Sequence, residues 1–234
     1  MNERPDERDE ASAVRARYAR RAVADPRYSL AQPAALAALH EREKAMVRLL
    51  VGAGLGDFAA LSLLEVGSGS GGNLLGLLRL GFAPDRLSGI ELLEERHAAA
   101  RARLPAGVTL IRGDATTVPI APASVDIVLQ ATVFSSLLDD AYQERLAGAM
   151  WQAVRPGGGI LWYDFTVDNP RNGDVRGVSR ARVRALFPQA RITWQRVTLA
   201  PPIARAACRL HPGLYGALNA LPLLRTHVLG WLAR

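Results

Sequence analysis

Short apolar runs alternate with helix-like segments through the middle of the chain, and most of the runs are followed by glycine or a polar residue. Runs rich in Val, Ile and Leu are typical of strands that are buried on both faces. We expect such strands at 61–67, 87–91, 108–112, 125–130 and 160–165. Helix-like segments separate them at 73–80, 92–103 and 140–154. Strands separated by helices predict an α/β fold with a parallel sheet that is covered on both faces.

Different patterns flank this alternating region. Before it, a helical spacing of apolar residues over 33–50 ends at a run of glycines. After it, a loop rich in Asn, Pro and Arg leads to a helix near 179–186 and a strand at 191–197. Apolar segments interrupted by proline fill 198–223, and a last strand is expected at 226–232. The pattern therefore predicts an insertion between the final two strands, above the end of the sheet where ligands bind.

No segment has the pattern of a signal sequence or of a membrane-spanning helix. The first ten residues are mostly charged, and the most apolar stretch, 213–233, is interrupted by Pro222, Arg225 and His227. Cys208 is the single cysteine, which excludes an internal disulfide framework and a multi-cysteine metal site. We therefore expect a soluble cytoplasmic protein without a bound metal.

Positive charge is concentrated in the last third of the chain. The net charge is +7, and residues 166–234 contribute 11 basic and 2 acidic side chains. All cations but Lys44 are arginines, a bias that GC-rich coding alone also produces. A sequence pI near 10.4 invites a nucleic-acid-binding function, but the arginines form no dense run and no nucleic-acid-recognition motif is present.

The strongest local signal is the segment Leu64-Glu-Val-Gly-Ser-Gly-Ser-Gly-Gly-Asn73. A strand that runs into a glycine loop at the start of a helix lets backbone approach a ligand closely and presents free N–H groups. Gly67, Gly69 and Gly72 fit the G-x-G-x-x-G pattern of dinucleotide enzymes, and a tight turn without any ligand is a second interpretation. The loop lacks the Gly-Lys-Ser/Thr ending of a phosphate-binding P-loop, which excludes that motif.

Three acidic residues favour a different cofactor from a dinucleotide. Glu65 precedes the glycines inside the strand, where an acid suits a cationic ligand. Glu91 ends the second strand, where a carboxylate can accept from both hydroxyls of a ribose. Asp114 follows the third strand and can accept from an adenine amino group. One glycine loop and two such acids at strand ends fit an adenosine with a charged amino-acid tail.

Five motifs in order resemble those of class I S-adenosylmethionine-dependent methyltransferases. They are Glu65-Val-Gly-Ser-Gly-Ser-Gly71, Gly89-Ile-Glu91, Gly113-Asp-Ala115, Ser124-Val-Asp-Ile-Val128 and Val154-Arg-Pro-Gly-Gly-Gly159. The resemblance implies a Rossmann-like, mostly parallel sheet of seven strands with an antiparallel last strand, and S-adenosylmethionine as the cofactor. It implies cofactor contacts by Glu65, Gly67, Ser68, Gly69, Glu91, Leu92, Asp114, Ala115 and Gln130, with Gln130 beside the sulfonium.

The resemblance also suggests how one domain is organised. Residues 1–60 are expected to form an N-terminal helical lid over the cofactor, in which Tyr18 and Tyr28 are expected to contact it. Residues 61–165 are expected to be the cofactor-binding core. Residues 166–234 are expected to hold the substrate-facing loop, the last strands and the apolar basic insertion.

A second resemblance concerns the flanking segments. They are Tyr18-Ala-Arg-Arg21, Arg27-Tyr-Ser29, Asn169-Pro-Arg-Asn172, Val175-Arg-Gly177, Leu199-Ala-Pro-Pro-Ile-Ala-Arg205 and Leu221-Pro-Leu-Leu-Arg-Thr-His227. These segments resemble an uncharacterised bacterial subgroup of methyltransferases associated with polysaccharide and secondary-metabolite gene clusters.

Acceptor-side residues are expected after the fourth and fifth strands. Asp164 is the candidate general base and His211, in the insertion, a second one. The candidate substrate-binding residues are Asn169, Arg171, Asn172 and Arg176, because guanidinium groups suit carboxylate or phosphate. The same segment is rich in ordinary turn residues, so a purely structural loop is the alternative interpretation.

The sequence thus predicts a methyltransferase that acts on a small-molecule or glycan acceptor, at a hydroxyl of an anionic molecule. One alternative is a lipid-linked acceptor, with the basic apolar insertion lying on the inner face of the membrane. Less favoured alternatives are an RNA methyltransferase and an adenosine-binding regulator without turnover.

Overall fold

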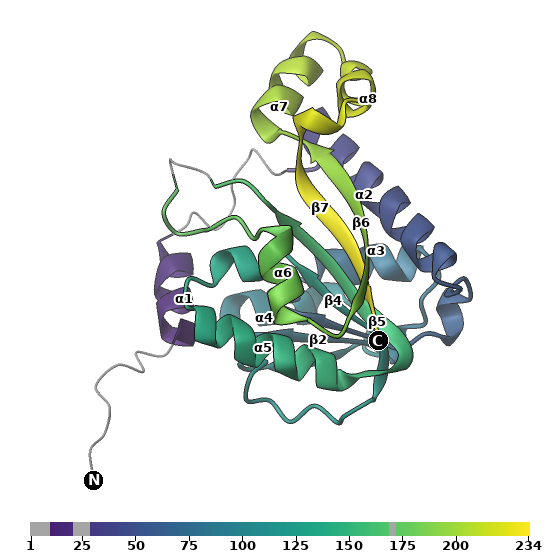
Figure 1. Cartoon of the computed structure of the whole chain (residues 1–234), viewed down its shortest axis with the longest axis vertical. Coiled ribbons are helices and arrows are strands. Elements are labelled where there is room, and N and C mark those ends of the chain that lie inside the picture. Colours follow the sequence, from purple (N-terminus) through teal and green to yellow (C-terminus); the bar gives the residue numbers. More distant parts are fainter. Residues whose placement is uncertain (1–9, 21–28, 169–171) are drawn as a thin grey trace.

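The computed structural model describes residues 10–20, 29–168 and 172–234. Seven strands form one sheet in the order β3-β2-β1-β4-β5-β7-β6, with helices on both faces (Figure 1). The strands are β1 (Leu63–Val66), β2 (Leu87–Glu91), β3 (Thr109–Arg112), β4 (Val125–Ala131), β5 (Val154–Phe165), β6 (Arg191–Leu199) and β7 (Arg225–Ala233). β1 to β5 pair in parallel, and β7 runs antiparallel to both β5 and β6. The predicted Rossmann-like α/β fold with an antiparallel last strand is confirmed.

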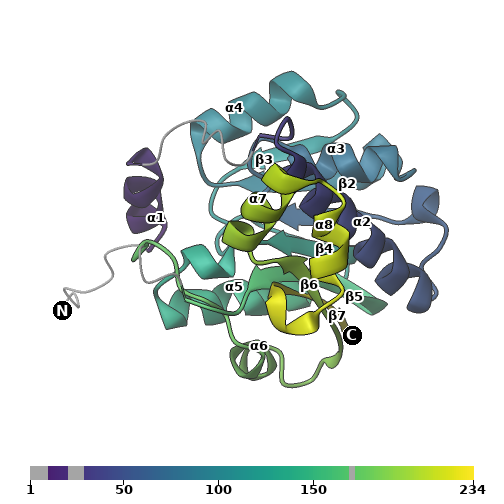
Figure 2. The same cartoon turned by 90° about the horizontal axis from the view of Figure 1, so that it is seen from above.

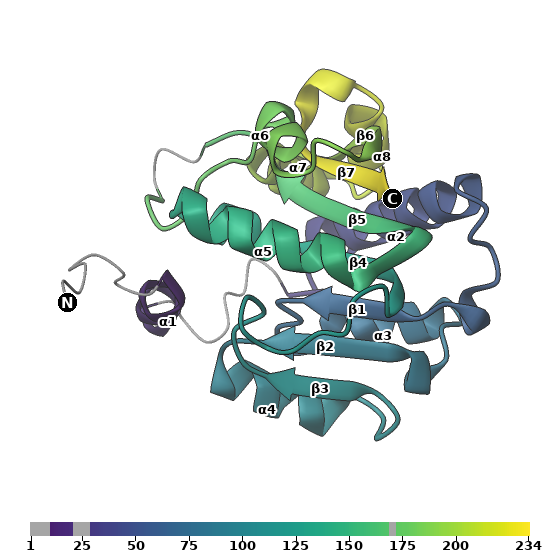
Figure 3. The ribbon, with the colours of Figure 1, turned by 60° about the horizontal axis from the view of Figure 1, so that its bottom comes forward.

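Two helical layers cover the sheet, one in front of the strands and one behind them in Figure 3. One layer contains α2 (Pro33–Gly52), α3 (Gly72–Arg79) and α4 (Glu94–Arg103). The other contains α5 (Asp140–Ala153) and α6 (Arg180–Leu186), and α1 (Glu10–Ala19) packs at its edge. Because side chains alternate along a strand, neighbouring residues of β1 and β5 belong to different layers.

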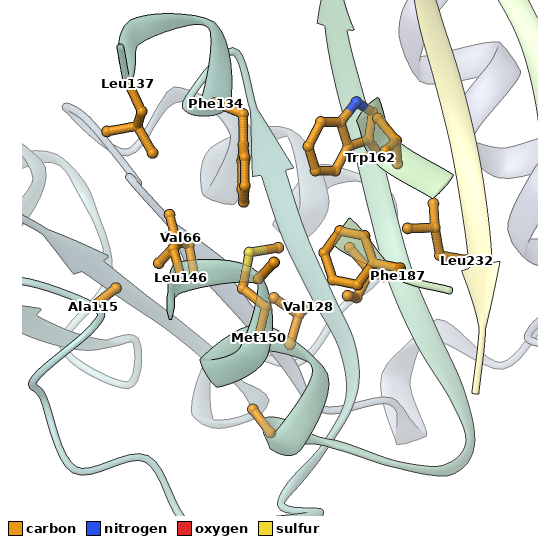
Figure 4. Packing of buried hydrophobic residues seen from close by; sticks show 14 of the residues in the cluster. Val66, Ala115, Val128, Phe134, Leu137, Leu146, Met150, Trp162, Phe187 and Leu232 are labelled. Carbon is orange, nitrogen blue, oxygen red and sulfur yellow. The ribbon is translucent and has the colours of Figure 1, made fainter. Parts of the chain in front are cut away.

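The layer under α5 and α6 is built on aromatic and aliphatic side chains (Figure 4). The ring of Trp162 in β5 lies 4.6 Å from that of Phe134 and 6.0 Å from that of Phe187. All three side chains are fully buried. This packing holds the segment after β4 against β5, next to the carboxyl ends of the strands.

β5 begins six residues earlier than the apolar pattern predicts. Residues 156–159 lie outside the predicted strand, but Val154 pairs with Val125 and Gly159 with Ile127 and Ala233. A register shift in β4 between Val125 and Ile127 accompanies this extension. A side chain on Gly159 would meet the indole of Trp231 at 2.5 Å, so the glycine is needed for close packing inside the strand.

The predicted insertion lies between β6 and β7. It contains α7 (Pro201–Leu210), α8 (Leu214–Asn219) and the short helix η5 (Pro222–Leu224), and it stands above the sheet beside the start of α2 (Figures 1 and 2). Glu41 of α2 accepts hydrogen bonds from the backbone N–H of Thr198, at 2.8 Å, and from the hydroxyl of Tyr215, at 3.1 Å. One carboxylate therefore ties α2 to β6 and to α8. No helix in the described part of the chain is long and apolar enough to cross a membrane.

Candidate functional site

A cavity of about 110 Å³ opens at the carboxyl ends of β1, β2, β3 and β4, and we call it the strand-end cavity. Ligands of parallel α/β sheets bind at this edge. Six of the residues predicted to bind the cofactor line it: Tyr18, Gly67, Glu91, Leu92, Asp114 and Ala115. The lining does not include Glu65, Ser68, Gly69 and Gln130, and Tyr28 is outside the described residues.

The glycine loop brings bare backbone to the cavity. Gly67 has φ +68° and Gly69 φ +56°, in the left-handed region that favours glycine. The N–H groups of Gly67 and Ser68 both donate to the carbonyl of Ile90, at 2.8 and 3.0 Å. A Cβ atom on Gly67 would lie 2.5 Å from Cγ2 of Val133, so no side chain fits at this position without movement.

The carboxylate of Glu91 binds the glycine loop at Gly69. Its Oε2 accepts from the N–H of Gly69 at 2.7 Å, and its Oε1 accepts from the N–H of Leu93 at 2.8 Å. Each carboxylate oxygen has two acceptor positions, so one remains on each oxygen for a ligand hydroxyl. This arrangement fits a pair of vicinal hydroxyls.

Asp114 is held by three hydrogen bonds on a single oxygen. The N–H and hydroxyl of Thr116 donate to its Oδ1 at 2.7 and 2.8 Å, and the hydroxyl of Tyr142 donates to the same atom at 2.7 Å. No described donor reaches Oδ2, so that oxygen can accept from a ligand amino group. Tyr142, which also lines the cavity, was not predicted, because its position in α5 carries no motif.

Glu65 is fully buried beneath the glycine loop. Asn73 donates from Nδ2 to its Oε1 at 2.6 Å, and Arg42 donates to Oδ1 of Asn73 at 2.6 Å. Oε2 of Glu65 has no partner among the described residues. Burial raises the pKa of Glu65 to about 7, against the lowering effect of Asn73 and of the Arg42 charge. A buried carboxylate with an unpartnered oxygen favours a cationic ligand nearby.

Gln130 and Ser68 are also buried behind the cavity. Gln130 donates to the carbonyl of Tyr163 at 3.3 Å and accepts from the N–H of Val133 at 3.2 Å, so it supports the segment after β4. The hydroxyl of Ser68 has no hydrogen-bond partner among the described residues.

α1 covers one side of the strand-end cavity. Arg17 donates to the carbonyl of Ser136 at 3.0 Å, and Glu10 accepts from the N–H of Leu138 at 2.8 Å. The ring of Tyr18 lies in the cavity wall, with the guanidinium of Arg96 4.6 Å from its centre. These contacts fix α1 to the segment that follows β4.

The two candidate bases line neither this cavity nor the second one described below. Asp164 is fully buried under the α5 layer, where it accepts from the N–H groups of Ser135, at 3.1 Å, and Phe165, at 3.0 Å. Burial raises its pKa to about 7. His211 follows α7 on the exposed surface and accepts from the N–H of Gly213 at 3.1 Å.

The loop after β5 carries the predicted substrate residues. Arg176 forms an ion pair with Asp140 of α5, and Asn172 accepts from the N–H of Asp174 at 3.1 Å. Neither side chain lines a cavity. Asn169 and Arg171 are outside the described residues.

A second cavity, of about 220 Å³, lies between α2, α7 and the upper ends of β5, β6 and β7, and we call it the α2–α7 cavity. Its polar lining residues are Arg42, Tyr163, Thr198, Arg205 and His227. None of these residues was predicted to belong to the site. Arg42 lies in the charged stretch His40-Glu-Arg-Glu-Lys44 of α2, and such a stretch is typical of a solvent-exposed helix face, so it gave no signal. In the described part of the chain, no cluster of His, Cys, Asp and Glu could hold a metal ion.

Residues 63–158 match the family model described as a methyltransferase domain. No curated protein sequence matches the chain significantly. Among solved structures, geranyl diphosphate C-methyltransferase from Streptomyces coelicolor A3(2), determined with Mg²⁺, geranyl diphosphate and S-adenosyl-L-homocysteine, is similar with a TM-score of 0.64 and 16% identity. That match covers 99% of this chain and 100% of the other.

Two further structures share the fold. An S-adenosylmethionine-dependent methyltransferase from Mesorhizobium loti has a TM-score of 0.58 and 17% identity, covering 81% of this chain and 97% of the other. One from Archaeoglobus fulgidus has a TM-score of 0.56 and 11% identity, covering 84% and 98%. The domain match lies on the strands and loops that build the strand-end cavity.

Proposed function

We propose that this S-adenosylmethionine-dependent methyltransferase, whose methyltransferase domain spans residues 63–158, methylates a hydroxyl group of an anionic small molecule. The observation that carries the cofactor-binding part of this proposal is the strand-end cavity itself. It combines the bare backbone of Gly67 with acceptor atoms of Glu91 and Asp114 in one wall.

The residues of this cavity fit each part of the cofactor. Glu91 would accept from the ribose hydroxyls, and Asp114 with Ala115 would bind the adenine. Gly67, Ser68 and Gly69 would run beside the amino-acid part, with the unpartnered Oε2 of Glu65 behind them. When bound, S-adenosylmethionine supplies an electrophilic methyl group on a sulfonium. The protein's own task is then to hold the acceptor atom close and in line, since positioning alone lowers the barrier greatly.

The distribution of charge supports an anionic acceptor. Residues 166–234 carry 11 basic and 2 acidic side chains, and they build the loop after β5, β6, the insertion and β7. We propose that Asn169, Arg171, Asn172 and Arg176 approach the acceptor from the loop, and that Asp164 or His211 takes the hydroxyl proton. A sugar acid or a phosphate-bearing glycan is one acceptor that fits this charge.

Calorimetry with S-adenosylmethionine, S-adenosylhomocysteine and NAD tests the cofactor assignment. Both adenosyl compounds should bind in about the micromolar range, a common range for enzyme ligands, and NAD should not bind. Tight binding of NAD together with no binding of S-adenosylhomocysteine would remove the proposal. A turnover screen against sugar acids and aromatic acids, with release of S-adenosylhomocysteine as the readout, then tests the acceptor class.

A lipid-linked acceptor is the second proposal, and one surface feature favours it. Leu210 and Leu223 in the insertion are 83% and 89% exposed, and Leu221 is more than half exposed. The exposed Arg209 stands next to Leu210 at the end of α7. Exposed leucines beside arginines fit an anionic membrane surface.

Co-sedimentation with vesicles tests this second proposal. Vesicles that contain phosphatidylglycerol should retain the protein at low salt, and neutral phosphatidylcholine vesicles should not. Leu223→Ser should reduce the retained fraction, whereas Leu36→Ser, which changes an exposed leucine on α2, should leave it unchanged. Absence of retention by anionic vesicles at low salt would exclude membrane binding.

A further inference from the structure

The α2–α7 cavity has an apolar wall with charge at two points. Alanines and leucines of α2 and α7 form most of its lining, among them Ala34, Leu39 and Ala204. Arg42 and Arg205 belong to the same lining. Pockets that are mostly apolar with a few placed polar groups are typical of small-molecule sites.

Both arginines lack a carboxylate partner in the described part of the chain. Arg42 donates to the amide of Asn73, and its guanidinium lies 5.0 Å from the centre of the Tyr163 ring. Arg205 forms no hydrogen bond or ion pair with any described residue, although it is half-buried. No described residue of the lining is acidic. Two arginines of this lining that form no ion pair with a described carboxylate favour a ligand that brings its own negative charge.

His227 adds no further charge to this cavity at neutral pH. Its ring stacks on that of Tyr163 with centres 5.1 Å apart, and its Nδ1 lies 3.0 Å from the hydroxyl of Thr226. Burial and the nearby charge of Arg42 lower the pKa of His227 to about 4, so the imidazole is neutral at pH 7. The positive charge of the cavity therefore comes from Arg42 and Arg205 alone.

The walls are held by bonds between separate elements. The hydroxyl of Tyr163 in β5 is 2.9 Å from that of Thr198 in β6, and Glu41 binds both β6 and α8 as described above. The cavity is thus a built feature of the insertion and α2.

The α2–α7 cavity and the strand-end cavity each share lining residues with a third hollow. A smaller hollow of about 30 Å³ between α2, α3 and β4 is lined by Arg42, Asn73, Ala131 and Tyr163. Ala131 also lines the strand-end cavity, and Arg42 and Tyr163 also line the α2–α7 cavity. Asn73 is the residue that binds Glu65. The third hollow therefore lies between the α2–α7 cavity and the strand-end cavity in the sense that it shares lining residues with both.

We infer that the α2–α7 cavity is the acceptor site, and that it takes an acid with an apolar body, its negative charge held by Arg205 and Arg42. This inference rests on the proposed function, because it places the acceptor relative to the strand-end cavity. It narrows the acceptor class, since an apolar wall disfavours the many hydroxyls of a sugar. It also assigns the acceptor's negative charge to Arg42 and Arg205 in place of Asn172 and Arg176, which do not line this cavity.

Two matched probes test the inference by calorimetry, in the presence of saturating S-adenosylhomocysteine. Indole-3-acetate carries an apolar ring and a carboxylate, and indole-3-acetamide has nearly the same shape without the charge. The acid should bind about tenfold more tightly than the amide, as expected for one charge-assisted pair. Arg205→Gln should remove this preference. Arg209→Gln changes an arginine on the exposed side of the same helix and should retain it.

A second variant tests whether the probes bind inside the cavity, independently of any change at Arg205. Ala35→Phe places a ring in the cavity from the α2 side and should weaken both probes about equally. Binding of S-adenosylhomocysteine to each variant shows that it is folded. Equal binding of acid and amide, binding of neither, or an equal loss in Arg209→Gln would overturn the inference. Failure of S-adenosylhomocysteine to bind the unaltered protein would instead contradict the proposed function.

Discussion

Asn73 donates to Oε1 of Glu65 over 2.6 Å, and this contact leaves Oε2 as the buried oxygen without a described partner. The same amide accepts from Arg42, so its orientation is fixed from the other side. The carboxylate of Glu65 is therefore held in one position through Oε1, while Oε2 remains able to accept a hydrogen bond. Its burial makes its ionisation sensitive to pH near neutrality.

Affinity for S-adenosylmethionine should rise with pH through the ionisation of Glu65. Burial holds the pKa of Glu65 at about 7, with Asn73 and Arg42 lowering it and Glu91 raising it. A cationic ligand favours the ionised carboxylate, which predominates above pH 7 and is scarce at pH 6. The dissociation constant measured by calorimetry should therefore fall by roughly tenfold between pH 6 and pH 8.

Glu65→Gln provides the control for this pH dependence. The variant should bind S-adenosylmethionine more weakly at pH 8, with a dissociation constant that hardly changes from pH 6 to pH 8. If the variant kept the slope of the unaltered protein, the titrating group would lie elsewhere.

Glu91→Ala should weaken binding of S-adenosylhomocysteine by about tenfold or more. The change removes the proposed acceptor for the ribose and leaves the N–H groups of Gly69 and Leu93 without their partner. A hydrogen bond to a charged group contributes about 1.5–3 kcal/mol. Calorimetry measures the loss. Glu94→Ala is the matched control, because Glu94 is exposed and pairs with Arg112 on the surface. Equal affinities for the two variants would contradict the role of Glu91.

Gly67→Ala should impair both folding and cofactor binding. The new Cβ would lie 2.5 Å from Val133, and the positive φ alone costs about 1–2 kcal/mol for a residue with a side chain. Thermal unfolding should occur at a lower temperature than in the unaltered protein. Gly52→Ala should not lower it, because no atom lies within 4 Å of the added Cβ and Gly52 ends a helix. A Gly67→Ala variant of unchanged stability and affinity would show that the loop is freer than the structure indicates.

The stability contribution of Asp164 should decrease as pH rises. Burial raises its pKa from 3.8 to about 7, so the folded protein retains a proton that the unfolded chain releases between these values. The free energy of unfolding therefore falls with pH over this window, and Asp164→Asn removes that dependence. The melting temperature of the unaltered protein should therefore fall relative to that of the variant between pH 5 and pH 8.

The same variant tests the proposed base. If Asp164 is the general base, Asp164→Asn should lower the turnover rate by about 100-fold or more. The variant should still bind S-adenosylhomocysteine. Unchanged turnover would leave Asp164 with only the hydrogen bonds to Ser135 and Phe165.

Much of the sheet could be predicted because apolar runs and glycines mark its strands directly. β2 has the predicted bounds, and β6 and β7 extend the predicted strands by only one or two residues at an end. The start of β5 was missed, since a glycine that packs under Trp231 looks the same in a sequence as a glycine in a turn. The local sequence pattern indicates which residues alternate along a strand. It does not indicate that the indole of Trp231, from another strand, packs against Gly159.

The candidate site divides in a similar way. Each of the three residues Gly67, Glu91 and Asp114 follows or ends its own strand, so a local pattern identifies it. In the structure all three line the strand-end cavity. Arg42, Thr198 and Arg205 come from a helix, a strand and the insertion, which are distant in the sequence. Their meeting depends on how the insertion folds back on α2, and no local spacing encodes that.

α1 and α7 lie over different cavities. α1 contributes Val14 and Tyr18 to the strand-end cavity, and α7 contributes Ala204 and Arg205 to the α2–α7 cavity. If α1 moves away from the strand-end cavity, α7 still covers the α2–α7 cavity, and the reverse also holds. If each cavity holds one substrate, neither has to leave before the other can be exchanged, and steady-state kinetics should follow a random order of binding and release.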